Sequence, residues 1–339
     1  MIGAFYAGFR RDRALVGISA IYFLAAAVHL DLSPLDWLKQ IASSLAGLLP
    51  ISLIFALLMR GIYHSVVWRA EKPITEIARE VRLLSSYDVL RFVPVAAAQV
   101  VLVAVFWRWK MDLPSFTWDQ TLDSIDRVLH FGFHPWQIIH PLVGYWFITA
   151  ILAFNYSMWF MFMWSVWLAF TFSDRPQRMQ FLLSFSLLWI VLGSLLASVF
   201  SSAGPCYFGS IVQGANPYAP LMAYLNEANT HIPILSLRTQ AMLWNGYVGH
   251  GPEFGISAMP SLHNAVALLM VLASKGFSHV IRRLLKLHMV LIFIGSVHLG
   301  WHYAVDAYVS WAVTLVAWFG IGYFLRDRRH TRISTFETR

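Results

Sequence analysis

Long apolar runs dominate the chain and set the first prediction of its fold. A helix needs about 20 mostly apolar residues to cross roughly 30 Å of hydrocarbon. Five clear runs of this kind occupy residues 14–30, 41–59, 92–107, 145–170 and 181–200, and they are followed by two shorter runs, 261–274 and 286–299, and a full one, 304–325. The pattern predicts an all-α, polytopic integral membrane helix bundle with about eight transmembrane helices.

The composition supports this class and excludes others. Of 339 residues, 58% are hydrophobic and 12% are charged, and the mean hydropathy is +0.60, whereas about a quarter of the residues of a soluble domain are charged. A disordered chain, a coiled coil and a disulfide scaffold are therefore excluded. The single cysteine, Cys206, forbids an intrachain disulfide and leaves too few thiolates for a zinc or iron–sulfur site.

The basic residues predict how the chain is oriented in the membrane. With eight spans, the termini and the even-numbered connections carry 20 of the 25 Lys and Arg residues, and cytoplasmic segments are the ones enriched in them. We therefore expect both termini in the cytoplasm and attribute the net charge of +8 to topology, with no nucleic-acid partner. The outer loops contain no Asn-x-Ser/Thr sequence, which favours a bacterial inner membrane over a lumenal one.

The first run also fits a cleaved signal peptide, because basic residues precede an apolar run that contains Ala25, Ala26 and Ala27. Its removal leaves seven spans with the same orientation. No internal repeat and no long polar linker divides the sequence, so residues 1–339 are predicted to form a single membrane domain.

Two amphipathic segments are predicted to be interfacial helices. Segment 65–90 sets Ile74, Ile77, Val81 and Leu84 at helical spacing among the charged residues Arg69, Glu71, Glu76, Arg79 and Glu80, which indicates a helix on the cytoplasmic surface. A second segment carries Trp118, Leu122, Ile125 and Leu129 on one side and Asp119, Asp123 and Asp126 on another. We expect this helix to lie flat against the outer leaflet.

A first polar cluster lies where the segment 201–260 enters the sixth span. It reads Gly255-Ile256-Ser257-Ala258-Met259-Pro260-Ser261-Leu262-His263-Asn264. Pro260 suits the first turn of a helix, Ser261 offers a hydroxyl, and the free N–H groups of that turn favour an anion such as phosphate. His263 could then give a proton to a leaving oxygen. The alternative is a helix that Ser261 merely caps and whose histidine bonds a neighbouring span.

A second cluster, His298-Leu299-Gly300-Trp301-His302-Tyr303-Ala304-Val305-Asp306, connects the last two spans. If the last span begins near Tyr303, Asp306 lies beside His302, can accept from one ring nitrogen and leaves the other nitrogen as a nucleophile. Two alternatives stay open: a structural hydrogen bond between spans, and a metal site made by His298, His302 and Asp306, which a helix break at Gly300 disfavours. By the charge distribution, both clusters lie on the outer face.

These residues resemble a known family. Pro260-Ser261-Leu262-His263 followed by His302-x-x-x-Asp306 is similar to the second and third signature motifs of the type 2 phosphatidic acid phosphatase superfamily. Leu262 and the run from His298 to Asp306 look most like the branch that contains inositol phosphorylceramide synthase. The resemblance covers a catalytic core of approximately 140–325. It implies that His302 attacks phosphorus to form a phosphohistidine, that Asp306 orients it and that His263 protonates the leaving group.

The sequence also departs from the family. An arginine that the family places shortly before the nucleophilic histidine is replaced by Ser296, and the Arg-Pro pair at Arg175 falls in a predicted cytoplasmic loop. Arg238, in the segment that leads to the first cluster, is the candidate phosphate clamp. The other candidate substrate-binding residues are Ser261, Pro260, Leu262, Tyr303 and His298.

A site short of cations suits a phosphodiester, which carries one negative charge, better than a monoester with nearly two. We therefore expect a lipid phosphotransferase that moves a phospho-headgroup from a membrane phospholipid to a lipid or polyol hydroxyl, with no metal or other cofactor. A lipid phosphate phosphatase with the same residues is the alternative. A transporter with intramembrane histidines is the alternative of another class.

The segment 201–259 is predicted to be a turn-rich, aromatic outer loop. It contains Gly204-Pro205-Cys206-Tyr207, Asn216-Pro217-Tyr218, Trp244 and Gly249-His250-Gly251-Pro252. Such a loop can form a lid that selects the acceptor, or it can be an ordinary interfacial loop with aromatic anchors. The sequence leaves both open.

Overall fold

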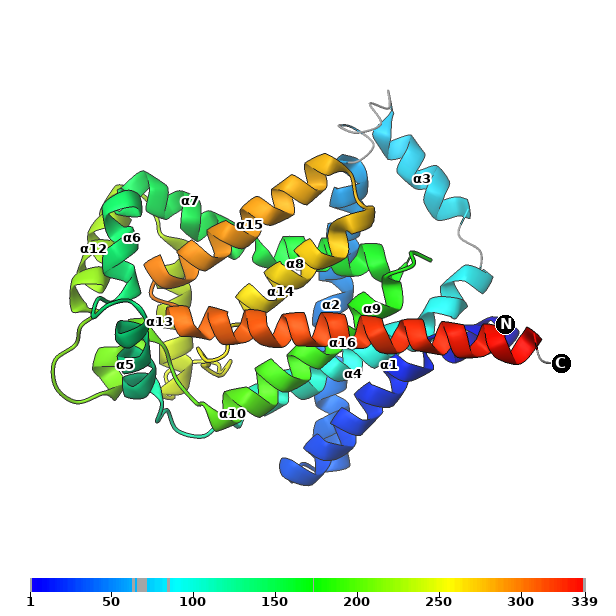
Figure 1. Cartoon of the computed structure of the whole chain (residues 1–339), viewed down its shortest axis with the longest axis horizontal. Helices are drawn as coiled ribbons and strands as arrows, with labels where there is room; N and C mark the ends of the chain where they lie inside the picture. Colours follow the sequence, from blue (N-terminus) through cyan, green and yellow to red (C-terminus); the bar gives the residue numbers. More distant parts are fainter. Residues whose placement is uncertain (1, 63–64, 66–71, 84–85, 173, 338–339) are drawn as a thin grey trace. The chain divides into compact units, whose positions relative to one another are not determined.

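The structure is a computed structural model that describes residues 2–62, 65, 72–83, 86–172 and 174–337 (Figure 1). In this part of the chain every regular element is a helix, as the all-α prediction required. The apolar runs correspond to α1 (Ile2–His29), α2 (Pro34–Ile62), α4 (Ser86–Met111), α7 (Trp146–Ser157), α8 (Trp159–Thr171), α9 (Arg178–Ile190), α14 (Leu262–Ala273), α15 (His279–His298) and α16 (Ala304–Glu337).

Within the part of the chain that the structure describes, five helical segments are long and apolar enough to cross a membrane: Ile2–His29, Val89–Met111, Trp146–Thr171, Arg178–Val199 and Ala304–Arg326. Leu262–Gly276 is a shorter apolar helix. A polytopic membrane helix bundle is therefore confirmed, and the number of eight spans stays a prediction. The fourth segment continues from α9 through a π-helical turn, η2 (Val191–Leu196), into α10 (Ala197–Val199).

Helices also occupy regions outside the apolar runs. They are α3 (Pro73–Leu83), α5 (Asp119–Leu129), α6 (Pro135–Val143), η3 (Pro205–Tyr207), α11 (Phe208–Ile211), α12 (Ala219–His231), α13 (Leu235–Tyr247) and η4 (Ser274–Gly276). The predicted cytoplasmic helix corresponds to α3, although Arg69, Glu71 and Leu84 lie outside the described residues. The segment 201–259 is largely helical, so its description as a turn-rich loop is corrected: Pro220 stands in the first turn of α12, where proline starts helices well.

The chain divides into two compact units. The first comprises Met1–Val105 and Met161–Ser186, and the second comprises Phe106–Phe160 and Leu187–Arg339. Both polar clusters belong to the second unit. The expected catalytic core of 140–325 therefore draws mostly on that unit, while its residues 161–186 belong to the first.

The first unit holds a buried ion pair between α1 and α9. Both guanidinium Nη atoms of Arg178 donate to the carboxylate of Asp12, and Arg178 Nε donates to the carbonyl of Thr171 at 3.2 Å. Asp12 is 0% exposed and Arg178 is 4% exposed. Charges this deeply buried are tolerated only when they are paired and hydrogen-bonded, so the pair fixes these two helices against each other.

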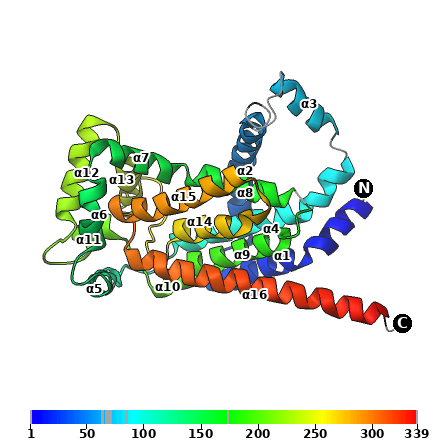
Figure 2. The same cartoon turned by 45° about the horizontal axis from the view of Figure 1, so that its top comes forward.

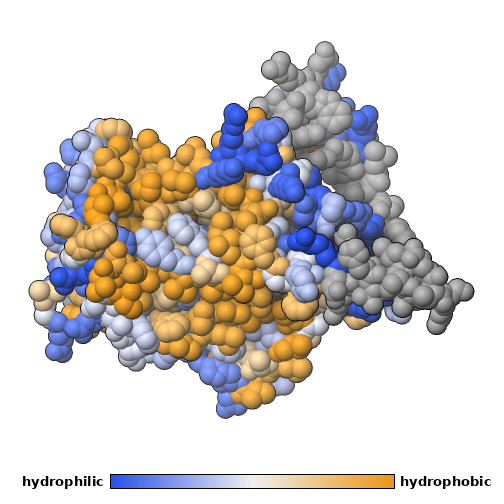
Figure 3. All heavy atoms as spheres, in the orientation of Figure 1, coloured by the Kyte–Doolittle hydropathy of each residue, from blue (hydrophilic) through white to orange (hydrophobic). Residues whose placement is uncertain are grey.

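The second unit is built around α14, which packs against both α15 and α16 (Figures 1 and 2). α7 also packs against α15. Apolar side chains cover the outward faces of α15 and α16, as Figure 3 shows, and they include Ile281, Leu284, Leu287, Val290, Leu315, Val316 and Phe319. Exposed apolar side chains at helical spacing on helices of this kind are typical of a lipid-facing surface.

Candidate active site

The first polar cluster forms the start of α14. Ser261 is its N-cap, and the hydroxyl accepts from the backbone N of Asn264 at 3.3 Å and from its Nδ2 at 3.0 Å. Pro260 lies one residue before the cap rather than in the first turn, which corrects that expectation. Ser261 is fully buried and does not line the cavity described below, whereas Pro260, Leu262 and His263 do. The hydroxyl of Ser261 thus serves the helix, as the capping alternative described.

The second cluster is folded back onto the end of α15. The carbonyl of Ser296 accepts from the backbone N–H groups of Trp301 and His302, both at 3.0 Å. Gly300 adopts φ +72, a conformation that side chains rarely allow, and the backbone of Cys206 lies close to it. The tight turn places His302 between the end of α15 and the start of α16. The histidine is therefore held in place by the chain on both of its sides.

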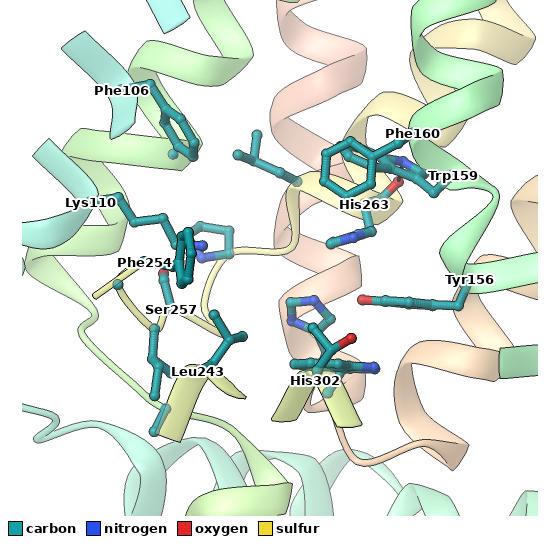
Figure 4. A pocket seen from close by; sticks show the side chains of 18 of the residues that line it. Phe106, Lys110, Tyr156, Trp159, Phe160, Leu243, Phe254, Ser257, His263 and His302 are labelled. Atoms are coloured by element: carbon teal, nitrogen blue, oxygen red, sulfur yellow. Dashed lines mark hydrogen bonds between the residues drawn. The ribbon is translucent and has the colours of Figure 1, made fainter. Parts of the chain in front are cut away.

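His302 and Asp306 form the predicted pair. His302 Nδ1 lies 3.2 Å from Asp306 Oδ2, to which it donates, and the backbone N of Tyr303 donates to the same oxygen at 3.1 Å. Asp306 is 0% exposed. Because Nδ1 is used by the carboxylate, Nε2 is the ring nitrogen left for chemistry. His302 lines the cavity (Figure 4), whereas Asp306, on the far side of the imidazole from Nε2, does not.

The two histidines converge although they come from different helices. Their ring centroids are 6.0 Å apart. His263 is stacked on Tyr156, with the centroids at 4.5 Å, and its ring lies 4.3 Å from that of Trp159. Figure 4 shows both imidazoles facing the same space. A phosphorus atom between them can be attacked from one ring while the other ring serves the leaving oxygen.

This space is a cavity of about 430 Å³. Its walls are mainly apolar and aromatic, and they include Phe106, Trp107, Trp159, Phe160, Trp189 and Phe254. The π-helical turn η2 contributes Leu192 and Gly193, and a side chain at Gly193 would collide with Phe106. π-turns often occur at functional sites. α13 forms another wall through Ser236, Thr239, Met242 and Leu243, so the 201–259 segment does enclose the site.

Among the described residues that line the cavity, Lys110 is the one Lys or Arg, and the sequence alone did not single it out. It lies in the last turn of α4 and is half-buried, and its Nζ lies 5.5 Å from the centre of the Trp107 ring. Among the residues that the structure describes, none forms an ion pair or hydrogen bond with Lys110. The signal available in the sequence was a lysine at the end of an apolar, aromatic span, but the direction of its side chain could not be inferred.

Arg238 takes a different position from the one expected. It is exposed on α13 and does not line the cavity, whereas Ser236, Thr239 and Leu243 on the same helix do. Residues three and four apart share a face of a helix. Spacing alone does not exclude Arg238, because Met242, four residues further on, lines the cavity. What separates Arg238 from the site is that its side chain is exposed and is not part of the cavity wall.

Two other candidate substrate-binding residues, Tyr303 and His298, are buried next to the site. Tyr303 is 1% exposed, and its hydroxyl donates to Asp119 at 2.8 Å. His298 is 0% exposed, and its Nε2 lies 2.9 Å from the hydroxyl of Thr149. Neither lines the cavity. Within the described residues no three His, Cys, Asp or Glu side chains are grouped to hold a metal ion.

The acidic side of α5 is buried, unlike that of a helix lying in an interface. Asp119, Asp123 and Asp126 are 1%, 8% and 1% exposed. Asp126 accepts from the backbone N–H groups of Ala304 at 2.7 Å and Val305 at 2.8 Å, so it caps the start of α16. Burial raises the pKa of Asp126 to about 7, and the two N–H groups act in the opposite sense.

Asp119 connects the segment that follows α10 to the site. Its carboxylate accepts from the backbone N–H groups of Ala203 at 2.9 Å and Gly204 at 2.8 Å, besides the hydroxyl of Tyr303. α5 thus ties the segment after α10 to the residues that flank His302. The spacing of the three aspartates predicted a shared face, but the backbone groups that this face meets could not be read from the sequence.

Comparison with known protein families matches residues 120–320 to the PAP2 superfamily. This match spans more than half of the chain and contains both histidine clusters. The chain belongs to the PAP2 superfamily. It matches no curated protein and no solved structure. The PAP2 superfamily consists of enzymes that act on phosphoesters, including lipid phosphates, and this PAP2 protein is therefore a membrane enzyme of phosphoester chemistry.

Proposed function

We propose that this PAP2 protein is a lipid phosphotransferase that works through a phosphohistidine at His302. One observation carries the proposal: the imidazoles of His302 and His263 lie 6.0 Å apart in one cavity, and a buried carboxylate stands behind the first. This is the arrangement of a nucleophile, its orienting group and a proton donor.

In the first step, the lone pair of His302 Nε2 attacks phosphorus. The bond from phosphorus to the leaving oxygen breaks, its electron pair stays on that oxygen, and the oxygen takes a proton from His263. Asp306 holds the ring in the required tautomer and stabilises the positive charge that develops on it. With a phospholipid as substrate, diacylglycerol leaves and the headgroup phosphate stays on His302.

In the second step, the hydroxyl oxygen of an acceptor attacks phosphorus and gives its proton to His263. The phosphorus–nitrogen bond breaks, and its electron pair returns to Nε2. Both histidines are thereby restored. If water is the acceptor, the same residues perform a phosphatase reaction, which is the second candidate function. The apolar, aromatic walls of the cavity disfavour water and favour a lipid or polyol hydroxyl.

The charge of the cavity supports a diester as donor, because Lys110 is the one Lys or Arg among its described lining residues. Lys110 offers one positive charge, which matches the one negative charge of a phosphodiester and is insufficient for a dianionic monoester. The similarity of Leu262 and of the run from His298 to Asp306 to the inositol phosphorylceramide synthase branch points to the same chemistry. The distribution of Lys and Arg supports an active site on the outer face, with both termini in the cytoplasm.

The test uses the purified protein in mixed micelles. Phosphatidylinositol, phosphatidylglycerol and phosphatidic acid, each with a fluorescent acyl chain, are supplied with and without ceramide or glycerol, and release of fluorescent diacylglycerol is measured. We expect release from a diester that depends on an added acceptor, loss of release in His302→Ala and His263→Ala, and no effect of EDTA.

The other functions give different results. Equal release with and without an acceptor would assign a phosphatase, and faster release from phosphatidic acid would reject the diester. Turnover unaffected by His302→Ala would reject the phosphohistidine mechanism. Absence of any release, together with movement of a labelled lipid or ion across proteoliposomes, would favour the transporter.

A further inference from the structure

Tyr156 stands out among the tyrosines of the second unit. It lies near the end of α7, lines the cavity and is 6% exposed. Its hydroxyl is buried, and within the described part of the chain it has no hydrogen-bond partner. The buried tyrosines nearby differ: Tyr207 donates to the carbonyl of Gln240 at 2.9 Å, and Tyr303 donates to Asp119 at 2.8 Å.

A buried hydroxyl without a partner is unfavourable, because it has lost its bonds to water and gained none. In a folded protein each such group calls for an explanation, and a ligand or a reacting group that supplies the missing partner is one of them. The position of Tyr156 therefore requires an explanation, and packing alone does not provide one: a phenylalanine would fill the same space without this cost.

The ring of Tyr156 is held on both faces. It stacks on His263 with centroids 4.5 Å apart and an interplanar angle of 22°, and it lies parallel to Trp301 at 6.0 Å and 4°. Figure 4 shows the hydroxyl pointing toward the His302 ring, on the side of the cavity where His263 also lies. The neighbouring rings thus fix the position of the hydroxyl oxygen before any substrate binds, and its hydrogen is free to turn toward a substrate oxygen.

We propose that Tyr156 is a catalytic residue whose hydroxyl donates a hydrogen bond to a non-bridging oxygen of the phosphoryl group as it moves between the leaving oxygen and His302. The proton stays on the tyrosine throughout, so no further acid or base is required. This inference rests on the proposed function. It supplies a neutral donor where the family has a guanidinium group and this chain has Ser296, whose side chain bonds Asn264 instead, at 3.2 Å.

A neutral donor fits the proposed substrate. The charge on the non-bridging oxygens of a diester is small in the ground state, and an O–H group held beside them contributes most in the transition state. Lys110 then attracts the diester, and Tyr156 acts during transfer. The Lys110 charge should therefore act mainly on KM, and the Tyr156 hydroxyl should act mainly on kcat.

The test compares Tyr156→Phe with Tyr308→Phe and His302→Ala in the micelle assay. Tyr308 is the control, because it lies outside the cavity and its hydroxyl already has a partner, His130 Nε2, at 2.9 Å. Removing one donor aimed at the reacting group is expected to lower kcat on the order of 10²-fold in Tyr156→Phe with little change in KM. Tyr308→Phe should keep kcat near that of the unchanged protein.

Thermal unfolding of the same variants separates catalysis from structure. Tyr156→Phe removes an unpaired buried hydroxyl and should unfold at the same temperature as the unchanged protein or at a higher one. An unchanged kcat in Tyr156→Phe, or equal losses in both tyrosine variants, would overturn the inference while leaving the proposed function standing. Turnover that survives His302→Ala would instead remove the proposed function and, with it, the inference.

Discussion

Replacing Asp306 by asparagine tests how much of catalysis depends on the carboxylate behind His302. Asparagine keeps the size of the side chain and can still accept from the backbone N of Tyr303, which donates to Asp306 at 3.1 Å. It removes the negative charge and can turn its amide toward the ring, which favours the wrong tautomer of His302. We expect kcat to fall strongly.

The magnitude follows from the geometry. Opposite unit charges separated by the 3.2 Å between His302 Nδ1 and Asp306 Oδ2 attract each other by about 5 kcal/mol at an effective dielectric constant of about 20. The ground state, with a neutral ring, already gains about 1 kcal/mol from the hydrogen bond. The difference of about 4 kcal/mol appears only as charge develops on the ring, and it corresponds to a loss in kcat of about 10³-fold.

The assay is release of fluorescent diacylglycerol under saturating and limiting substrate. KM should change little, because Asp306 is fully buried and does not line the cavity. Ser310→Ala is the control: Ser310 lies on the same helix and its hydroxyl donates to the carbonyl of Asp306 at 2.6 Å, so its loss leaves the carboxylate in place. A decrease in kcat below about tenfold in Asp306→Asn would refute the electrostatic reasoning.

Three further predictions concern other parts of the molecule. Lys110→Met should lower kcat/KM on the order of 10²-fold, whereas Arg238→Ala, outside the cavity, should leave it nearly unchanged; both follow from initial rates at limiting substrate. Arg178→Ala removes two charged hydrogen bonds to the buried Asp12 and leaves the carboxylate paired with Arg11; it should lower the free energy of unfolding by about 1–3 kcal/mol, which thermal denaturation in detergent would detect. Burial raises the pKa of the Cys206 thiol, so a maleimide at pH 8 should react slowly with the folded protein and rapidly after SDS denaturation; fast labelling of the folded protein would contradict this burial.

The spans and the His302–Asp306 pair could be predicted because each depends on local spacing. The thickness of a bilayer sets the length of an apolar helix. Side chains four residues apart in the sequence lie close together where a helix starts. The meeting of His263 with His302 was predicted from the charge distribution, which placed both clusters on one face. Each of these inferences needs only the period of a helix and the sign of the charges.

The cation of the site could not be chosen in the same way. Lys110 and Arg238 were both assigned to the outer face, and only the rotation of each helix about its axis decides which one faces the cavity. Tyr156 gave no signal at all, since a tyrosine in an apolar span is usual and its missing partner is visible only once the fold is known. Side-chain direction at a site made by several helices depends on their packing rather than on any one segment.

The burial of the acidic side of α5 has a genetic consequence. Asp119 accepts from the Tyr303 hydroxyl, and Asp126 accepts from the backbone N–H groups of Ala304 and Val305; all three residues directly follow His302, and neither aspartate lines the cavity. A random screen for inactive variants should therefore recover substitutions at these two aspartates beside those at the histidines, and the recovered proteins should bind lipid normally while transferring phosphate slowly.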